Sequence, residues 1–174
     1  MAARPLVSIV VPVYNGERFV RESLDSIIAQ TCQDVEILVM DDASTDSTPQ
    51  ILRSYRDRIR VNRQKKNRGQ FQNVTDGIAL ATGKYVAVYH ADDVYMPTIA
   101  EREAAFLDAH ADVGAVFALD IMIDAEGRER GQGQVKLPKE ILANVPLQYP
   151  SVLNALLLHK NRIFRAPSSM VRAS

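Results

Sequence analysis

Two kinds of apolar repeat alternate along the first two-thirds of the chain, and together they predict a succession of strands and helices. Nearly continuous apolar runs rich in β-branched residues occur at 7–13, 35–40 and 85–89. Such runs predict strands that are buried on both faces, as in the centre of a parallel sheet. Weaker runs at 59–62 and 113–123 predict two further strands. The chain therefore has enough strands for one central sheet.

Between these strands, apolar residues recur every three or four positions, which is typical of helices that pack one face on a sheet. We expect Asn15 to cap the first helix and Pro49 to lie in the first turn of the second, which should run to about Asp57. Gly83 should end the third helix, and Thr98 has the capping-box spacing that opens a fourth. This alternation predicts an α/β fold with a mostly parallel central sheet, helices on both faces and right-handed crossovers.

The pattern weakens after residue 130. Residues 131–150 lack a clear period, and for the short apolar segment 152–158 a helix and a strand both remain open. We therefore expect the chain to divide into two regions, 1–130 and 131–174.

Composition and charge exclude several classes of protein. The 174 residues carry 21 basic and 21 acidic side chains, and this zero net charge argues against nucleic acid as a partner. Cys32 is the sole cysteine and no signal-peptide pattern opens the chain, so we expect a reducing, cytoplasmic setting. No apolar run approaches the roughly 18 residues that a membrane-spanning helix needs.

Polar clusters follow three of the predicted strands, at 12–15, Asp41–Asp42 and Asp92–Asp93. Parallel strands end at one edge of their sheet, where α/β proteins bind ligands. Adjacent carboxylates repel each other unless a cation or hydrogen bonds compensate, and Mg²⁺ or Mn²⁺ beside a substrate diphosphate is the simplest compensation. The alternative, that a pair only caps the following turn or helix, stays open for each pair taken alone.

Five motifs in a fixed order make the chain similar to a known family. They are the segments 7–16, 35–48, Asn67–Gly69, 81–86 and Ala91–Asp93. Together they resemble the family-2 glycosyltransferases of the GT-A fold, over about residues 6–125. The resemblance implies inverting transfer of a sugar from a nucleotide-diphosphate donor, most commonly a UDP-sugar, to an acceptor hydroxyl. It also implies Mg²⁺ or Mn²⁺ between the diphosphate and the acidic motif, and a role in cell-surface polysaccharide biosynthesis.

The resemblance implies roles for individual residues. The nucleotide-binding positions are Pro12, Tyr14, Asn15, Glu17, Asp41, Asp42, Asn67, Gly69 and Asp92, and the metal-binding positions are Asp93 and Asp92. Asp92 contacts the ribose or the metal. Tyr14 either stacks on the base or packs beside the sheet. Asp42 is expected to accept a base N–H, while Asp41 supports the loop or the ribose. Glu17 lies either near the nucleotide or on an exposed helix end.

The sequence departs from the family pattern at three places. His90 stands where the family often has an acidic residue, and we expect a histidine packed at the strand end rather than a partner of the metal site. Val74-Thr75 replaces an arginine-asparagine pair that is usual in the third helix. The general base of the family follows a segment that 167–172 resembles, so we expect it beyond Ser174. The first region is then the donor-binding part, and the second is the truncated start of the acceptor-side part.

The segment from Arg53 to Arg68 concentrates positive charge, with eight Lys or Arg residues against the acid Asp57. A solvated surface is the first interpretation, and attraction to an anionic membrane or a lipid-linked acceptor is the second. A glycan acceptor and a second copy of the chain are further expected partners. Two competing functions stay open, a nucleotide-binding module without transfer activity and a nucleotidyltransferase.

Overall fold

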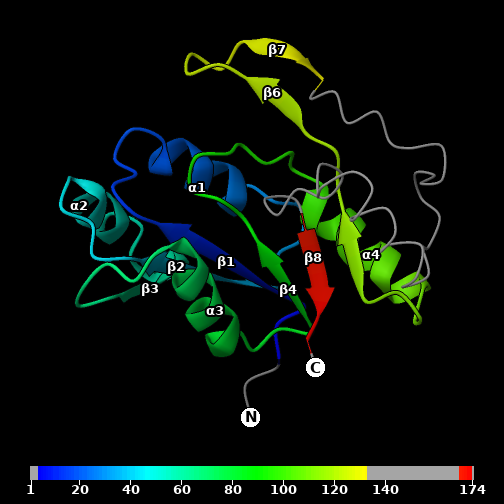
Figure 1. Cartoon of the computed structure of the whole chain (residues 1–174). Helices are drawn as coiled ribbons and strands as arrows, with labels where there is room; N and C mark the ends of the chain where they lie inside the picture. Colours follow the sequence, from blue (N-terminus) through cyan, green and yellow to red (C-terminus); the bar gives the residue numbers. More distant parts are fainter. Residues whose placement is uncertain (1–3, 133–168, 174) are drawn as a thin grey trace, which may run out of the picture.

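The computed structural model describes residues 4–132 and 169–173. Its centre is a six-stranded sheet in the order β3-β2-β1-β4-β8-β5 (Figure 1). The strands are β1 (Val7–Val13), β2 (Val35–Asp41), β3 (Arg60–Arg63), β4 (Tyr85–Val88), β5 (Ala115–Phe117) and β8 (Ser169–Arg172). Strands β1 to β4 run parallel, whereas β8 is antiparallel to both of its neighbours. The prediction of a mostly parallel sheet is confirmed.

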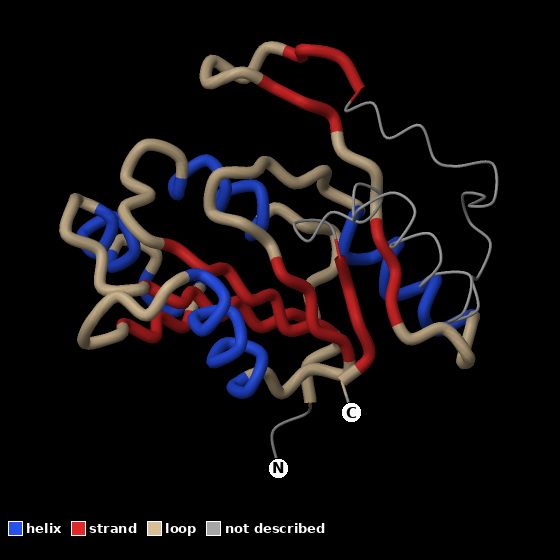
Figure 2. The backbone as a smooth tube through the Cα atoms, viewed as in Figure 1, coloured by secondary structure: helices blue, strands red, loops and turns tan. Residues whose placement is uncertain are grey.

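Strand β1 lies between β2 and β4, and each of its residues is buried, which explains its unbroken apolar run. On one face, Val7, Ile9 and Val11 belong to the larger core, to which α1 (Val20–Ile28), α2 (Thr48–Arg53) and α4 (Ile99–Ala109) contribute. On the other face, Val10 belongs to a smaller core beside α3 (Gln70–Leu80). Helices therefore cover both faces of the sheet, as predicted (Figure 2).

Helix α3 approaches the sheet closely at Gly77. A Cβ atom at this position would lie 2.4 Å from Val10 Cγ1 and 2.9 Å from Met40 Cγ. Both distances are far below van der Waals contact, so the packing of α3 on β1 and β2 depends on a residue without a side chain. This contact fixes the height of α3 above the sheet.

Three of the predicted helix boundaries are wrong. Gly83 does not end the third helix, because α3 ends at Leu80 with Ala81 as its C-cap residue. Helix α1 begins at Val20, because Asn15 takes a left-handed backbone conformation with φ 52° and binds a neighbouring loop instead of capping a helix. The second helix ends at Arg53, and a short 3-10 helix, η1 (Arg56–Arg58), follows where Arg56 has φ 48°. A residue in this conformation cannot continue an α-helix.

The predicted capping box of α4 is also absent. Thr98 is the N-cap residue but makes no side-chain hydrogen bond to the helix. The carboxylate of Glu101, which was to complete the box, accepts a hydrogen bond from Thr31 Oγ1 at 2.6 Å. A tertiary contact has replaced the local one.

None of the helices that the structure describes has the length and apolar character needed to cross a bilayer.

The predicted strand 113–123 is divided into two strands. Strand β5 belongs to the main sheet, whereas β6 (Ile121–Ile123) pairs with β7 (Glu129–Gln132) in an antiparallel hairpin that projects from the rest of the molecule (Figure 1). Strand β8 comes from the far end of the chain and separates β5 from β4. The segment 152–158 and all but the first two residues of 131–150 lie outside the described residues, so the proposed division of the chain stays a prediction.

Candidate functional site

The loops that follow β1, β2 and β4 surround a cavity of about 800 Å³ at one edge of the sheet. It is lined by Pro12, Val13, Tyr14, Asn15, Gly16, Phe19, Asp42, Asn67, Gly69, Gln70, Asn73, His90, Ala91 and Asp92. Of the predicted nucleotide-binding residues, Glu17 and Asp41 are not part of this lining. The fold brings the others together in one hollow, while their contacts with a nucleotide stay a prediction. Tyr14 is 50% exposed, which leaves its ring available at the cavity.

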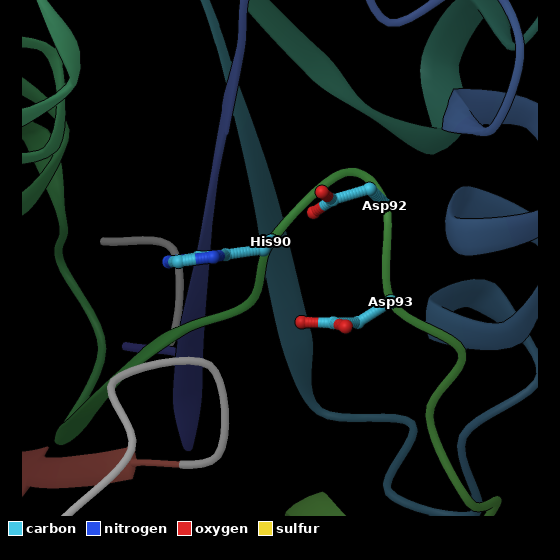
Figure 3. A group of neighbouring side chains, drawn as sticks. All are labelled: His90, Asp92 and Asp93. Atoms are coloured by element: carbon cyan, nitrogen blue, oxygen red, sulfur yellow. The ribbon is translucent and has the colours of Figure 1, made fainter. Parts of the chain in front are cut away.

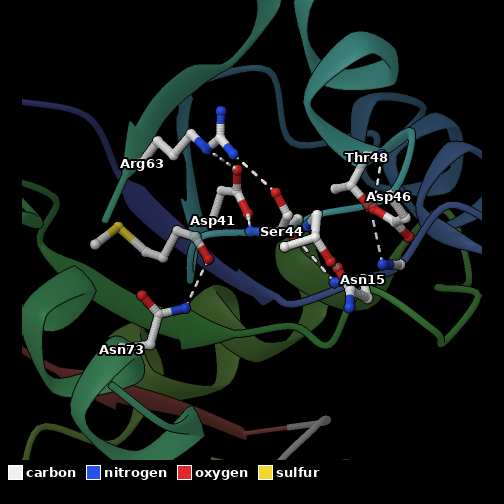
Figure 4. A network of polar contacts seen from close by, with 10 residues as sticks. Asn15, Asp41, Ser44, Asp46, Thr48, Arg63 and Asn73 are labelled. Atoms are coloured by element: carbon white, nitrogen blue, oxygen red, sulfur yellow. Dashed lines mark hydrogen bonds and ion pairs between the residues drawn. The ribbon is translucent and has the colours of Figure 1, made fainter. Parts of the chain in front are cut away.

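Asn15 connects the loop after β1 to the loop after β2 (Figure 4). Its backbone N–H donates to Ser44 Oγ at 2.9 Å, and its Oδ1 accepts from the N–H of Thr45 at 2.8 Å. The next residue, Gly16, donates its N–H to Thr48 Oγ1 at 2.8 Å. These bonds join two loops that are about 30 residues apart in sequence. Asn15 thus shapes one wall of the cavity through its backbone conformation and its amide.

Glu17 and Asp46 hold the start of α2. The Glu17 carboxylate accepts the N–H of Ser47 at 2.9 Å, and Asp46 accepts the N–H groups of Glu17 and Thr48 at 3.0 and 2.9 Å. Partial burial opposes ionisation of Asp46, but its hydrogen bonds with Thr48 and with backbone N–H groups lower its pKa below the ordinary value. Glu17 is exposed, but it precedes α1 instead of lying on the end of that helix, and it binds the N-cap residue of α2.

Asp41 and Asp42 are both buried, and each organises a different loop. Asp41 accepts the N–H of Ser44 at 2.9 Å and pairs with Arg63 Nε at 3.1 Å (Figure 4). This geometry agrees with the loop-supporting alternative for Asp41. The two oxygens of Asp42 accept the N–H groups of Arg68 and Gly69, each at 2.8 Å. Asp42 therefore holds the segment before α3 at the cavity. Each of its carboxylate oxygens retains a lone pair that can accept a further hydrogen bond.

Asn73 is a cavity residue that sequence reasoning missed. Its side chain is 1% exposed and its Nδ2 donates to the backbone oxygen of Met40 at 2.6 Å (Figure 4). Its Oδ1 is buried and has no hydrogen-bond partner among the described residues. Such an unpaired acceptor costs free energy unless a ligand or water supplies a donor. The sequence indicates this position only indirectly. Asn73 is a polar residue four positions before Gly77, so the two lie on the same face of α3, which packs on the sheet.

His90, Asp92 and Asp93 lie on the loop after β4, where the carboxylates of Asp92 and Asp93 point into the bend of the loop and the ring of His90 extends outside it (Figure 3). One ligand atom from each lies within 4.8 Å of the others. Opposite ligands of a six-coordinate cation with bonds of about 2.1 Å are separated by about 4.2 Å, so small side-chain rotations suit this group to a divalent metal. The histidine that was expected to pack at the strand end is half-buried, lines the cavity and lies beside both acids.

The backbone of His90 is held from both sides. Its N–H donates to the hydroxyl oxygen of Tyr95 at 2.6 Å, and its carbonyl accepts the hydroxyl of Ser23 at 2.9 Å. Tyr95 in turn donates its own N–H to Ser26 Oγ at 3.0 Å. Helix α1, which carries both serines, therefore positions the acidic loop.

A buried aromatic pair and a buried acid lie beneath this loop. The ring of Tyr95 stacks on that of Tyr89, with centroids 4.0 Å apart and planes inclined by 8°. Burial raises the pKa of the Tyr95 hydroxyl, which keeps it neutral near pH 7. The hydroxyl of Tyr89 donates to Glu103 at 3.4 Å, and burial raises the pKa of this carboxyl group to about 8. The loop thus rests on uncharged, packed groups.

Comparisons with known proteins agree on one family. The sequence profile described as Glycosyl transferase family 2 matches residues 8–169. An uncharacterized glycosyltransferase of Rickettsia prowazekii is 42% identical over 104 residues, which are 60% of this chain and 32% of that protein. S. aureus TarS 1-349, solved in complex with UDP-GlcNAc, has a TM-score of 0.70 and 27% identity, with 95% of this chain and 45% of that chain covered. The mannosyltransferase PcManGT from Pyrobaculum calidifontis, solved with GDP-Man and Mn²⁺, has a TM-score of 0.61 and 28% identity, with 68% and 36% covered.

These matches span between 32% and 45% of the length of the three similar proteins. The family profile covers most of this chain, from β1 to the first residue of β8. The structural similarity to TarS extends over nearly all of it and agrees with the mostly parallel sheet described above. The chain therefore belongs to glycosyltransferase family 2 and has the GT-A fold.

Proposed function

We propose that this chain binds a nucleotide-diphosphate sugar, with a UDP-sugar as the first candidate, for metal-dependent, inverting transfer of the sugar to an acceptor hydroxyl. The observation that carries the proposal is the cavity at the carboxyl ends of β1, β2 and β4, with His90, Asp92 and Asp93 on one loop beside it. This edge is where open α/β sheets bind nucleotides. TarS bound to UDP-GlcNAc and PcManGT bound to GDP-Man and Mn²⁺ support the same class of donor and cofactor.

In this proposal the nucleoside half of the donor lies between the loops after β1 and β2. Tyr14 offers its exposed ring for stacking on the base, and Asp42 accepts a base N–H with the lone pairs that its loop contacts leave over. To the predicted residues we add Asn73, which lines the cavity and whose buried, unpaired Oδ1 would accept a donor group of the nucleoside after a small rotation of the side chain. Pro12, Asn67 and Gly69 complete the lining around these groups.

The diphosphate half would lie beside the loop after β4. Asp92, Asp93 and His90 would hold Mg²⁺ or Mn²⁺ there. When bound, such a cation neutralises the charge that develops on the departing diphosphate. Ser23 and Tyr95 keep the backbone of this loop in place through their bonds to His90. We assign the general base to none of the described residues.

Calorimetry of UDP binding with Mn²⁺, with Mg²⁺ and with EDTA tests the proposal. We expect UDP to bind in the presence of metal and its affinity to fall by roughly tenfold or more in EDTA, because the diphosphate charge is then uncompensated. Asp93→Ala should abolish most of this metal dependence. Asp112→Ala, which removes an exposed acid from the loop after α4, is the matched control and should bind like the wild type. Metal-independent binding in the wild type would contradict the proposed site.

Product analysis separates sugar transfer from its two rivals. Incubation with UDP-sugars and candidate glycan or lipid-linked acceptors should release UDP and give a glycosylated acceptor. Release of pyrophosphate from a nucleoside triphosphate would instead indicate a nucleotidyltransferase. Nucleotide binding without either product would support a binding module. Replacing UDP with GDP in the calorimetry decides which base the cavity prefers.

The basic segment supports a second part of the proposal, attraction to an anionic membrane surface that carries the acceptor. Within it, Arg63 pairs with Asp41 and Arg68 pairs with Asp76. All eight basic residues of the segment are exposed, and the six outside these two ion pairs are Arg53, Arg56, Arg58, Arg60, Lys65 and Lys66. Vesicles of anionic lipid should retain the protein at low salt and release it at high salt.

The predicted homodimer is tested by light scattering over a range of protein concentrations.

A further inference from the structure

The three polar side chains on the loop after β4 differ in chemistry, and this difference bears on which metal they would hold. Asp92 and Asp93 supply carboxylate oxygens, whereas His90 supplies an imidazole nitrogen. All three ligand atoms lie within 4.8 Å of one another, with the carboxylates of Asp92 and Asp93 inside the bend of the loop and the ring of His90 extending outside it (Figure 3). The nitrogen is therefore part of the cluster rather than a neighbour of it.

The position of the imidazole is built into the fold. Because the N–H and the carbonyl of His90 are both hydrogen-bonded, to Tyr95 and Ser23, its Cα has little freedom to move away. The ring is half-buried at the cavity wall. A ligand whose backbone is held in place favours the metal whose chemistry it matches.

Magnesium and manganese respond differently to such a donor. Mg²⁺ requires a nearly ideal shell of oxygen atoms and gives up its waters reluctantly. Imidazole suits Zn²⁺, Cu²⁺, Fe²⁺ and Ni²⁺ best, and Mn²⁺ has the lowest affinity of the first-row divalent ions. Mn²⁺ is nevertheless a softer ion than Mg²⁺ and accepts a nitrogen ligand more readily. Two carboxylates and the diphosphate of a donor would accept either ion, whereas a nitrogen in the set favours the transition metal.

We infer that His90 is a direct metal ligand and that its imidazole makes this site selective for Mn²⁺ and similar transition ions over Mg²⁺. The inference rests on the proposed function, since it takes the metal site as given and concerns the choice of ion. It goes beyond that function because it identifies the residue that sets the preference. A histidine that only packs against the loop, or that only hydrogen-bonds to an acid, would leave the preference unchanged.

The test compares the wild type with His90→Asp, which replaces nitrogen with oxygen at the same position. Affinities for Mn²⁺ and Mg²⁺ are measured with saturating UDP at pH 7.5, by electron paramagnetic resonance of free Mn²⁺ and by competition with Mg²⁺. We expect His90→Asp to reduce the ratio of Mn²⁺ to Mg²⁺ affinity on the order of tenfold. His110→Gln, which changes a histidine at the end of α4, should leave the ratio unaltered.

A spectroscopic measurement identifies the ligand directly. In the Mn²⁺–UDP complex of the wild type, electron spin echo modulation should show a coordinated ¹⁴N, and the signal should be absent in His90→Asp. This measurement on the wild type decides the matter even if the variant does not fold. Mn²⁺-dependent UDP binding without a coordinated nitrogen, or with an unchanged metal ratio in a folded variant, would overturn the inference and leave the proposed function standing. Absence of binding with both metals would count against the proposed function itself.

Discussion

The hydroxyl of Tyr95 accepts a hydrogen bond of 2.6 Å from the backbone N–H of His90, which ties the acidic loop to the buried aromatic pair beneath it. This contact joins the core to the cavity wall. It lets stability and ligand binding be tested with one substitution, because phenylalanine keeps the ring and removes only the oxygen.

Tyr95→Phe should therefore destabilise the fold and weaken metal-dependent nucleotide binding together. The lost bond leaves the His90 N–H without its partner, at a cost of about 1–2 kcal/mol in the free energy of unfolding. Urea denaturation and calorimetry with UDP and Mn²⁺ measure the two effects. Tyr55→Phe is the control, since it removes a buried hydroxyl bonded to Asp25 away from the cavity and should change stability alone. Equal effects of the two variants on metal dependence would refute the positioning role.

Asn15 should be sensitive to backbone conformation as well as to its amide. Asn15→Gly loses the bond to Thr45 but tolerates φ 52°, whereas Asn15→Ala loses the bond and also opposes this conformation. We expect the alanine variant to be less stable than the glycine variant by about 1 kcal/mol. Chemical denaturation of the two proteins side by side gives the difference. A glycine variant that is no more stable than alanine would show that the left-handed conformation relaxes away.

Glu103 should make stability depend on pH near neutrality. Burial raises the pKa of its carboxyl group to about 8 in the folded protein, above the ordinary value of 4.5. The unfolded chain therefore releases this proton at lower pH than the folded protein does. The contribution of Glu103 to stability is complete below about pH 4.5 and is lost progressively as the pH rises toward 8.

The variant Glu103→Gln isolates this contribution. Glutamine keeps the size of the side chain and stays neutral, so the variant should lack the decline between pH 5 and 8. It should also gain on the wild type as the pH rises. Thermal unfolding at a series of pH values measures both curves, and parallel curves would mean that Glu103 ionises normally in the folded state.

Gly77 should be essential for the packing of α3. In Gly77→Ala the new Cβ would overlap Val10 and Met40, and relief of this overlap should cost about 1–3 kcal/mol of stability. Gly114→Ala is the matched control, because nothing lies within 4 Å of a Cβ at that position. Denaturation midpoints should fall for the first variant and stay within a few degrees for the second. A small change in stability of Gly77→Ala would mean that α3 can shift outward without a loss of stability.

Features that depend on neighbours in sequence were predictable. The run Val7–Val13 is apolar throughout because both faces of β1 are covered, and such burial leaves a local pattern. Because parallel strands end at one edge of their sheet, the sequence also predicts that Tyr14, Asp42 and Asp92 lie at that edge, and all three line the cavity.

Features that depend on distant partners were not predictable. Asn15 has the composition of a helix cap, but its bond with Thr45 decides that it braces a loop instead. Thr98 and Glu101 have the spacing of a capping box, but Thr31 takes the carboxylate. In both cases a tertiary hydrogen bond competes with a local one of similar strength, and the sequence pattern contains only the local one.

The α/β class, the order of the motifs and the family follow from the sequence alone, because buried strands and the polar groups at their ends form patterns among residues that are close together in the chain. The position of β8 between β4 and β5, the place of Asn73 in the cavity lining with a buried, unpaired oxygen, and the approach of His90 to Asp92 and Asp93 became known from the folded structure. These three features depend on the directions of side chains and on contacts between segments that are distant in sequence. Both are fixed by packing, which is complete only when the whole sheet has formed.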